Sequence, residues 1–226
     1  IVNHEKVADY YRIPSINLAL EVSQRMQAGE FDWETFGGTH PAPYGHKIYA
    51  AAVNRLLDKM WNTPPSGNPN GIKPHLLPET PLDAFSYFGG KLVDIQKAEL
   101  GKGWRYEANW QPKVKANTRK AFVDVPAIET LEAGSQLRFS FTGKAIGIFN
   151  VAGPDAGIIE YSVDGRPYKK KDLFTEWSGK LYIPWVTMLE SELEEGEHEI
   201  TIRMAKEHNP SSKGTACQIF YFTVNE

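Results

Sequence analysis

The sequence predicts two regions of different fold class, an α/β fragment over residues 1–62 and an all-β jelly-roll or β-sandwich domain over residues 82–226. Three observations support this division. Helical and extended patterns alternate before residue 62, six prolines interrupt residues 63–81, and short alternating strands with turn residues follow residue 82. We therefore expect residues 63–81 to be a Pro-rich linker between two domains.

The first region predicts three helices and one strand. A helix over residues 3–12 begins at the N-cap Asn3 and ends before Pro14, because a residue that precedes proline disfavours helical backbone. Residues 15–18 are a strand candidate, and residues 19–28 and 46–61 have helical patterns. One strand cannot form a sheet. We therefore expect residues 1–62 to be the C-terminal end of an α/β domain whose larger part lies outside this chain.

The second region predicts at least six strands, because apolar and polar residues alternate in short runs. An Asp164-Gly165 turn predicts a hairpin between residues 157–163 and 166–170. Cys217, the single cysteine, lies in an apolar alternating run and is expected to be a buried thiol. One cysteine also excludes an internal disulfide and a cysteine-based zinc site.

Composition excludes several classes of partner. The net charge of −3 gives no basic surface for nucleic acid or for an anionic membrane, so neither is an expected partner. No apolar run reaches the ~18 residues that would span a bilayer. No two histidines have metal-ligand spacing with a third ligand nearby, so we expect no metal and no cofactor. A structural calcium ion at Asp155 or Asp164 is the alternative, although the Asp-Gly turn explains Asp164 without one.

His40 is the strongest candidate for a catalytic histidine, because it lies in a Gly37-Gly38-Thr39-His40-Pro41 turn directly before a predicted helix. A free imidazole titrates near pH ~6.5, so it can accept a hydroxyl proton and return it at neutral pH. The turn pattern alone also fits a histidine whose ring caps the local turn. His46 begins the helix and is expected to be structural.

These residues resemble the last conserved block of the SGNH/GDSL hydrolases, in which His-Pro is followed by Gly-His and Tyr-Ala. The matching stretches here are residues 37–41 and 45–50, and residues 7–17 resemble the preceding helix and final strand of that family. The resemblance implies the C-terminal part of a flavodoxin-like three-layer domain. Residues 82–226 resemble the β-rich domain of bacterial SGNH esterases that act on polysaccharides, through GPDAGIIEYSVDG and the closing FTVN.

The resemblance implies a serine ester hydrolase that acts on an acylated carbohydrate or another ester, with His40 as the general base. The nucleophilic serine and the oxyanion hole would come from the N-terminal portion of the same domain, because this chain has no Gly-Asp-Ser stretch. Ser15 and Ser23 lie in a predicted strand and helix and are poor nucleophile candidates. The resemblance also implies a periplasmic or extracellular location.

The orienting residue departs from the family pattern, because the usual aspartate position holds Gly37. Asp32 or Glu34 could orient His40, a backbone carbonyl could do so, or the site could bind without turnover. Loss of the orienting carboxylate in a serine-protease triad lowers turnover by about 10⁴.

The alternative function is a non-catalytic carbohydrate-binding or assembly module. In that case Trp104, Trp110 or Trp177 would stack on sugar rings, although the preferred interpretation of each is a core tryptophan of the sandwich.

Overall fold

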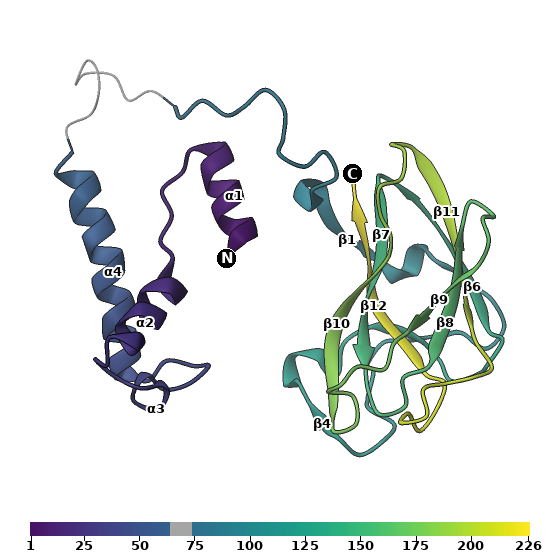
Figure 1. The fold of residues 1–226 in the computed structure, drawn as a ribbon. Coiled ribbons are helices and arrows are strands. Elements are labelled where there is room, and N and C mark those ends of the chain that lie inside the picture. Colours follow the sequence, from purple (N-terminus) through teal and green to yellow (C-terminus); the bar gives the residue numbers. More distant parts are fainter. Residues whose placement is uncertain (64–73) are drawn as a thin grey trace. The chain divides into compact units, whose positions relative to one another are not determined.

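The computed structural model describes residues 1–63 and 74–226. They form two compact units, Ile1–Ala84 and Phe85–Glu226 (Figure 1). The first unit is helical and the second is built from strands, so the chain as a whole is mostly β. Among the described residues, no helix is both long enough and apolar enough to cross a membrane.

The described part of the first unit contains four helices: α1 (Val2–Tyr11), α2 (Leu18–Gln27), α3 (Trp33–Phe36) and α4 (Pro43–Trp61). Arg12, with φ of 51°, ends α1 in a left-handed conformation before Pro14. Asn17 begins α2, because its side chain accepts a hydrogen bond from the Leu20 amide at 2.9 Å. Helices α2, α3 and α4 share a small apolar core of Val22, Phe31, Phe36 and Ile48, with Met26 and Tyr49 at its edge.

The predicted fold class was wrong, because the described residues contain no flavodoxin-like three-layer α/β fold. The strand predicted at residues 15–18 is absent, and Leu18 is already helical. The physical reason is local: four residues are too few to separate a strand from a helix start, and Asn17 is an N-cap. Ser15 lies in the loop and donates a hydrogen bond to Glu5 Oε2 at 2.8 Å.

Residues 64–73, within the predicted linker, lie outside the described residues. The segment that follows them packs on α1. His75 Nε2 forms a hydrogen bond with the Tyr11 carbonyl oxygen at 2.7 Å, and the Tyr10 hydroxyl donates to the Thr80 carbonyl oxygen at 2.7 Å. These bonds explain why residues 74–84 belong to the first unit rather than to the second.

The second unit is a β-sandwich of two sheets. The seven-stranded sheet has the order β3-β5-β12-β7-β10-β4, and β1 also pairs with β12; the five-stranded sheet has the order β2-β6-β11-β8-β9. The 3-10 helix η1 (Tyr87–Gly89) precedes the first strand, and η2 (Ile95–Lys97) and η3 (Lys120–Phe122) lie between strands. The strands are β1 (Gly90–Asp94), β2 (Glu99–Leu100), β3 (Arg105–Glu107), β4 (Asn117–Thr118), β5 (Ala127–Thr130), β6 (Gln136–Thr142), β7 (Ala145–Ala152), β8 (Ile158–Val163), β9 (Lys169–Asp172), β10 (Leu181–Glu190), β11 (Glu197–Met204) and β12 (Cys217–Asn225).

Alternating apolar residues from both sheets fill the space between them. Phe139 of β6 and Phe222 of β12 stack across the two layers with ring centroids 3.9 Å apart. Cys217 is fully buried in this core, which confirms the prediction of a buried thiol, and burial raises its pKa. Asp164 and Gly165, with φ of 53° and 71°, form the predicted turn between β8 and β9.

The outer face of the seven-stranded sheet is covered over only part of its area. A second apolar cluster lies there, centred on Trp110, Tyr182 and Phe220. Farther along the same sheet, Leu92, Val186 and Tyr221 are exposed. The sandwich therefore has one sheet face that is partly open to solvent.

Candidate functional site

The turn that carries His40 is fixed by close contacts between α3 and α4. Gly37 ends α3 with φ of 107°, and the Ala42 amide donates to the Phe36 carbonyl oxygen at 2.9 Å. A Cβ atom at Gly37 would lie 2.0 Å from the Ala42 nitrogen, and one at Gly45 would lie 2.5 Å from the Phe36 oxygen. Both positions therefore require glycine, and these contacts place His40 in a rigid turn just before Pro43 begins α4.

His40 is exposed to solvent at this turn. Within residues 1–63 and 74–226, its ring makes no hydrogen bond and no ion pair. The imidazole is therefore free to accept a proton from a group that approaches it. His46, in the first turn of α4, is also exposed.

Neither predicted carboxylate orients His40. Asp32 caps α3, because its Oδ1 accepts the Thr35 amide at 2.7 Å, and the hydrogen bonds from Thr35 lower the pKa of the Asp32 carboxyl. Glu34 is exposed, and no described hydrogen bond joins it to His40. Gly37 has no room for a side chain. In the described structure, none of the positions 32, 34 and 37 therefore provides a carboxylate that orients His40.

An open apolar pocket of about 530 Å³ lies between α2, α3 and α4. It extends to Thr39, the residue directly before His40. Ser23 lines the pocket from α2, but no described hydrogen bond joins it to His40. The pocket therefore ends one residue before His40, and its apolar lining is of the kind found in ligand sites. Its lining is Ala19, Val22, Ser23, Met26, Gln27, Trp33, Phe36, Gly38, Thr39 and Tyr49.

The three tryptophans considered for stacking on sugar rings differ in their exposure to solvent. Trp104 and Trp110 are 7% and 1% exposed, so neither can stack on a sugar. Trp177 is 54% exposed and lines an open groove of about 890 Å³ beside β4 and β10. Of these three residues, only Trp177 remains a candidate for contact with carbohydrate.

Of the two aspartates considered as calcium ligands, Asp164 is bound to other protein groups and Asp155 is buried. Asp164 Oδ2 forms an ion pair with His198 Nδ1 at 2.7 Å, and its Oδ1 accepts the Glu199 amide at 3.0 Å. Asp155 is 6% exposed, and burial raises the pKa of its carboxyl. Across the described ranges, no group of three or more His, Cys, Asp or Glu side chains could hold a metal ion.

Sequence reasoning missed a groove on the open face of the seven-stranded sheet. It has a volume of about 260 Å³ and includes Tyr87, Met188, Thr223 and Asn225. The signal was present in the alternation of β12, where Thr223 and Asn225 place polar side chains on the outer face. Both residues belong to the closing FTVN stretch of the chain.

Two solved structures of one two-domain esterase share the fold of this chain. A two-domain esterase (CEX) active on acetylated mannans matches 99% of the chain with a TM-score of 0.71 at 15% identity, and the chain spans 58% of that esterase. The same esterase co-crystallized with mannopentaose gives 0.69, at 15% identity, over 99% of this chain and 57% of that one. A family two carbohydrate esterase from Cellvibrio japonicus gives 0.39, at 12% identity, over 60% of this chain and 32% of that one. No protein-family model matches the sequence, and no curated protein matches it.

Proposed function

We propose that the chain is part of a serine ester hydrolase of the SGNH/GDSL type that removes acyl groups from carbohydrate. The observation that carries the proposal is His40, an exposed imidazole without a described partner, held in a turn that glycines at positions 37 and 45 keep tight. The fold shared with an esterase active on acetylated mannans supports the substrate class.

In this proposal, His40 is the general base. Its ring accepts the hydroxyl proton of a serine while the serine oxygen attacks the ester carbonyl carbon, and the ring then donates that proton to the departing sugar oxygen. Water hydrolyses the acyl-serine in a second cycle of the same proton transfer. The apolar pocket that extends to Thr39 offers space beside the base for an acyl group.

The serine would come from polypeptide outside these 226 residues, as part of an N-terminal portion of the hydrolase. Two features support this. Ser15 is paired with Glu5, and the first unit leaves large apolar side chains exposed, among them Trp33 at 53% and Trp61 at 75%. Monomeric proteins rarely leave such patches uncovered. A covering polypeptide would also bring a group that orients His40, which Asp32 and Glu34 do not.

The test compares two histidines in the complete protein that supplies the serine. We expect His40→Ala to lower kcat/KM for acetylated mannan by about 100-fold or more, the usual contribution of a general base. His46→Ala, an exposed histidine on the adjacent helix, should remain within about threefold of the parent enzyme, because it transfers no proton. Unchanged kcat/KM in His40→Ala would refute the proposal.

A control uses the 226-residue chain by itself with p-nitrophenyl acetate. Without the serine, we expect no turnover above that of free imidazole. Substantial turnover by the chain that survives His40→Ala would place the reaction elsewhere in these residues.

A second candidate function is a non-catalytic carbohydrate-binding module. The observation in its favour is Trp177, whose exposed ring lines the open groove beside β4 and β10. This function predicts binding to polysaccharide that Trp177→Ala abolishes and His40→Ala leaves unchanged. Titration calorimetry of both variants distinguishes it from the esterase.

A further inference from the structure

The groove on the outer face of the seven-stranded sheet lies along a row of residues from β10, β7, β12 and β1. Strand register places Met188 of β10 and Thr223 of β12 on either side of Gly147 of β7. Leu92 of β1 extends this row on the far side of Thr223. Gly147 leaves no free space in the middle of this row, because a Cβ atom there would lie 2.7 Å from both Thr223 Oγ1 and the Thr187 carbonyl oxygen. The hollow is lined by Met188, Thr223 and Leu92 themselves. The next outward row holds Val186, Phe149 and Tyr221, and Val186 of this row lines the groove.

The floor of the groove holds two polar atoms without partners. Asn225 is 5% exposed, and its Nδ2 donates to the Ser86 carbonyl oxygen at 3.2 Å, but its Oδ1 has no partner in the described structure. The Thr223 hydroxyl is also buried without a partner. An unpaired buried polar group lowers stability, so such groups mark places where a ligand or water completes the hydrogen bonding.

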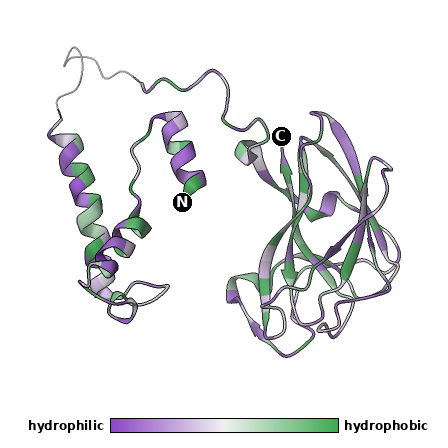
Figure 2. Ribbon diagram, viewed as in Figure 1, coloured by the Kyte–Doolittle hydropathy of each residue, from purple (hydrophilic) through white to green (hydrophobic). Residues whose placement is uncertain are grey.

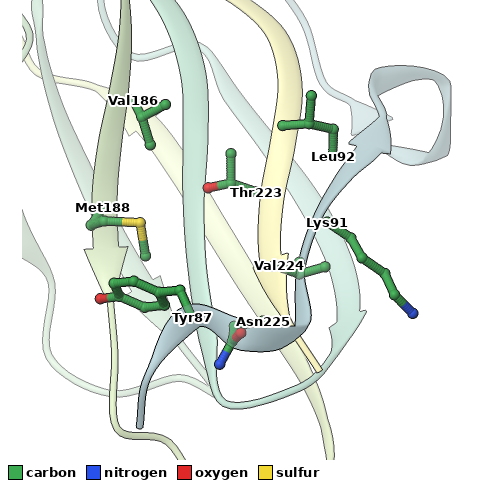
Figure 3. Close-up of a pocket in the computed structure, with 9 residues that line it drawn as sticks. Tyr87, Lys91, Leu92, Val186, Met188, Thr223, Val224 and Asn225 are labelled. Carbon is green, nitrogen blue, oxygen red and sulfur yellow. The ribbon is translucent and has the colours of Figure 1, made fainter. Parts of the chain in front are cut away.

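The walls around these atoms are apolar. Figure 3 shows Thr223 between Val186 and Leu92, with Met188 and Tyr87 on one side and Asn225 at the lower end. The Lys91 side chain points away from the hollow and pairs with Glu226, so the groove contains no free charge from this residue. The chemistry of the groove therefore favours a neutral ligand.

We propose that this groove binds one acetylated hexopyranose unit. The unpaired Asn225 Oδ1 accepts a hydrogen bond from a sugar hydroxyl, and the Thr223 hydroxyl donates to the ester carbonyl oxygen. The acetyl methyl group contacts Val186 and Met188, and Tyr87 lies against the apolar face of the ring. A volume of about 260 Å³ is slightly below the ~300–1,000 Å³ of drug-sized ligand sites, which fits a single sugar unit.

This inference rests on the carbohydrate class of the proposed function, but it concerns a site in the second unit and needs no serine. The test therefore uses the 226-residue chain with His40→Ala, so that no hydrolysis can follow binding. The chain has four methionines, and each gives one methyl signal after ¹³C-methyl labelling. Met188 lines the groove, whereas Met204 is 2% exposed in the core and serves as an internal reference.

Titration with methyl 2-O-acetyl-β-D-mannopyranoside should shift the Met188 signal and leave Met204 unchanged. Methyl β-D-mannopyranoside, which lacks the acetyl group, should bind about tenfold more weakly, because one buried methyl group is worth about 10–200-fold. No Met188 shift with either sugar up to its solubility would overturn the inference. A Met188 signal that changes with protein concentration and not with sugar would assign the groove to a second copy of the chain, and would also overturn it.

Variants identify the contacts. Thr223→Val keeps the shape of the side chain and should weaken binding of the acetylated sugar about fivefold, the effect of one neutral hydrogen bond. Tyr87→Ala should weaken it further. Two controls should bind as the parent does: Thr201→Val on β11 of the other sheet, and Trp177→Ala in the separate groove. Unchanged binding in both Thr223→Val and Tyr87→Ala would show that the sugar lies elsewhere.

Discussion

At the residue scale, a few positions decide the shape of the candidate site. The turn pattern around His40 was readable from the sequence, because two glycines and a proline before an amphipathic run indicate a turn and a helix start. What the sequence could not show is that Asp32 caps α3 and is therefore committed to the Thr35 amide. That commitment depends on where α3 begins, which local pattern does not fix to within one residue. The general-base role of His40 stays a prediction.

Gly37 provides a direct test of this geometry, because it holds the family's aspartate position. Gly37→Asp should destabilise the first unit by at least ~2 kcal/mol, since φ is 107° and the new Cβ would clash with Ala42. Gly38→Asp is the matched control. Its φ of 75° is also left-handed, but a Cβ there meets only Trp33 Nε1 at 3.9 Å, so the cost should be smaller. Urea unfolding followed by the amide signals of α4 measures both. Equal stability of the two variants would contradict the contact between α3 and α4.

At the element scale, the positions of the strands were easier to predict than the surface features that neighbouring strands form together. The alternation in β6, β11 and β12 indicated sheet structure, and the Asp164-Gly165 turn specified a hairpin, because only a few residues accept two consecutive positive φ values. The groove was not predictable, since it depends on register between Met188, Gly147 and Thr223, which lie far apart in the sequence. The strand predicted at residues 15–18 was wrong for a local reason. Its four-residue pattern was too short to outweigh the helix cap at Asn17.

The contact between β11 and the β8–β9 turn predicts a pH-dependent stability. The Glu194 carbonyl oxygen and Asp164 both accept from the His198 ring and raise its pKa. Burial by itself would raise the pKa of Asp164, but the hydrogen bonds from the Glu199 amide and His198 outweigh it and lower that pKa. The histidine contribution is complete below its unfolded pKa of about 6.5 and is lost as pH rises through the folded value. The aspartate contribution is present above about pH 3.9 and is lost as pH falls through its own folded value.

We therefore expect the second unit to lose about 1 kcal/mol or less of stability between pH 6 and pH 9 through this pair. His198→Gln should remove most of that slope, because glutamine does not titrate. Urea unfolding at several pH values, with His208→Gln as the control for a histidine without a carboxylate partner, measures the effect. An unchanged slope in His198→Gln would show that another group is responsible.

At the scale of the whole molecule, the two units differ in how well they bury apolar surface. The sandwich encloses a large core between its sheets, and its strands cooperate through long-range pairing. Among its described residues, the first unit has one apolar cluster of four buried side chains, and it exposes Trp33, Met60 and Trp61. Figure 2 shows hydrophobic and hydrophilic residues interleaved along α4. The sequence indicated two regions of different composition, but it could not show that the first contains no sheet among its described residues.

This difference predicts separate unfolding. Residues 85–226 expressed alone should fold and melt within about 3 °C of the same unit in the whole chain, because their core does not use the first unit. Residues 1–84 alone should be only marginally stable, because a helical unit of this size buries too little surface. Calorimetry of both pieces checks this. A single cooperative transition in the whole chain that neither piece reproduces would contradict it.

The central claim is that His40 transfers the proton in ester hydrolysis. Chemical rescue tests it most directly, because the exposed turn leaves space for a free base where the ring was removed. In the complete protein, added imidazole should restore saturable activity on acetylated mannan to His40→Ala and have no such effect on His46→Ala. Full activity of His40→Ala without imidazole, or a loss that imidazole does not restore in a folded variant, would contradict the account.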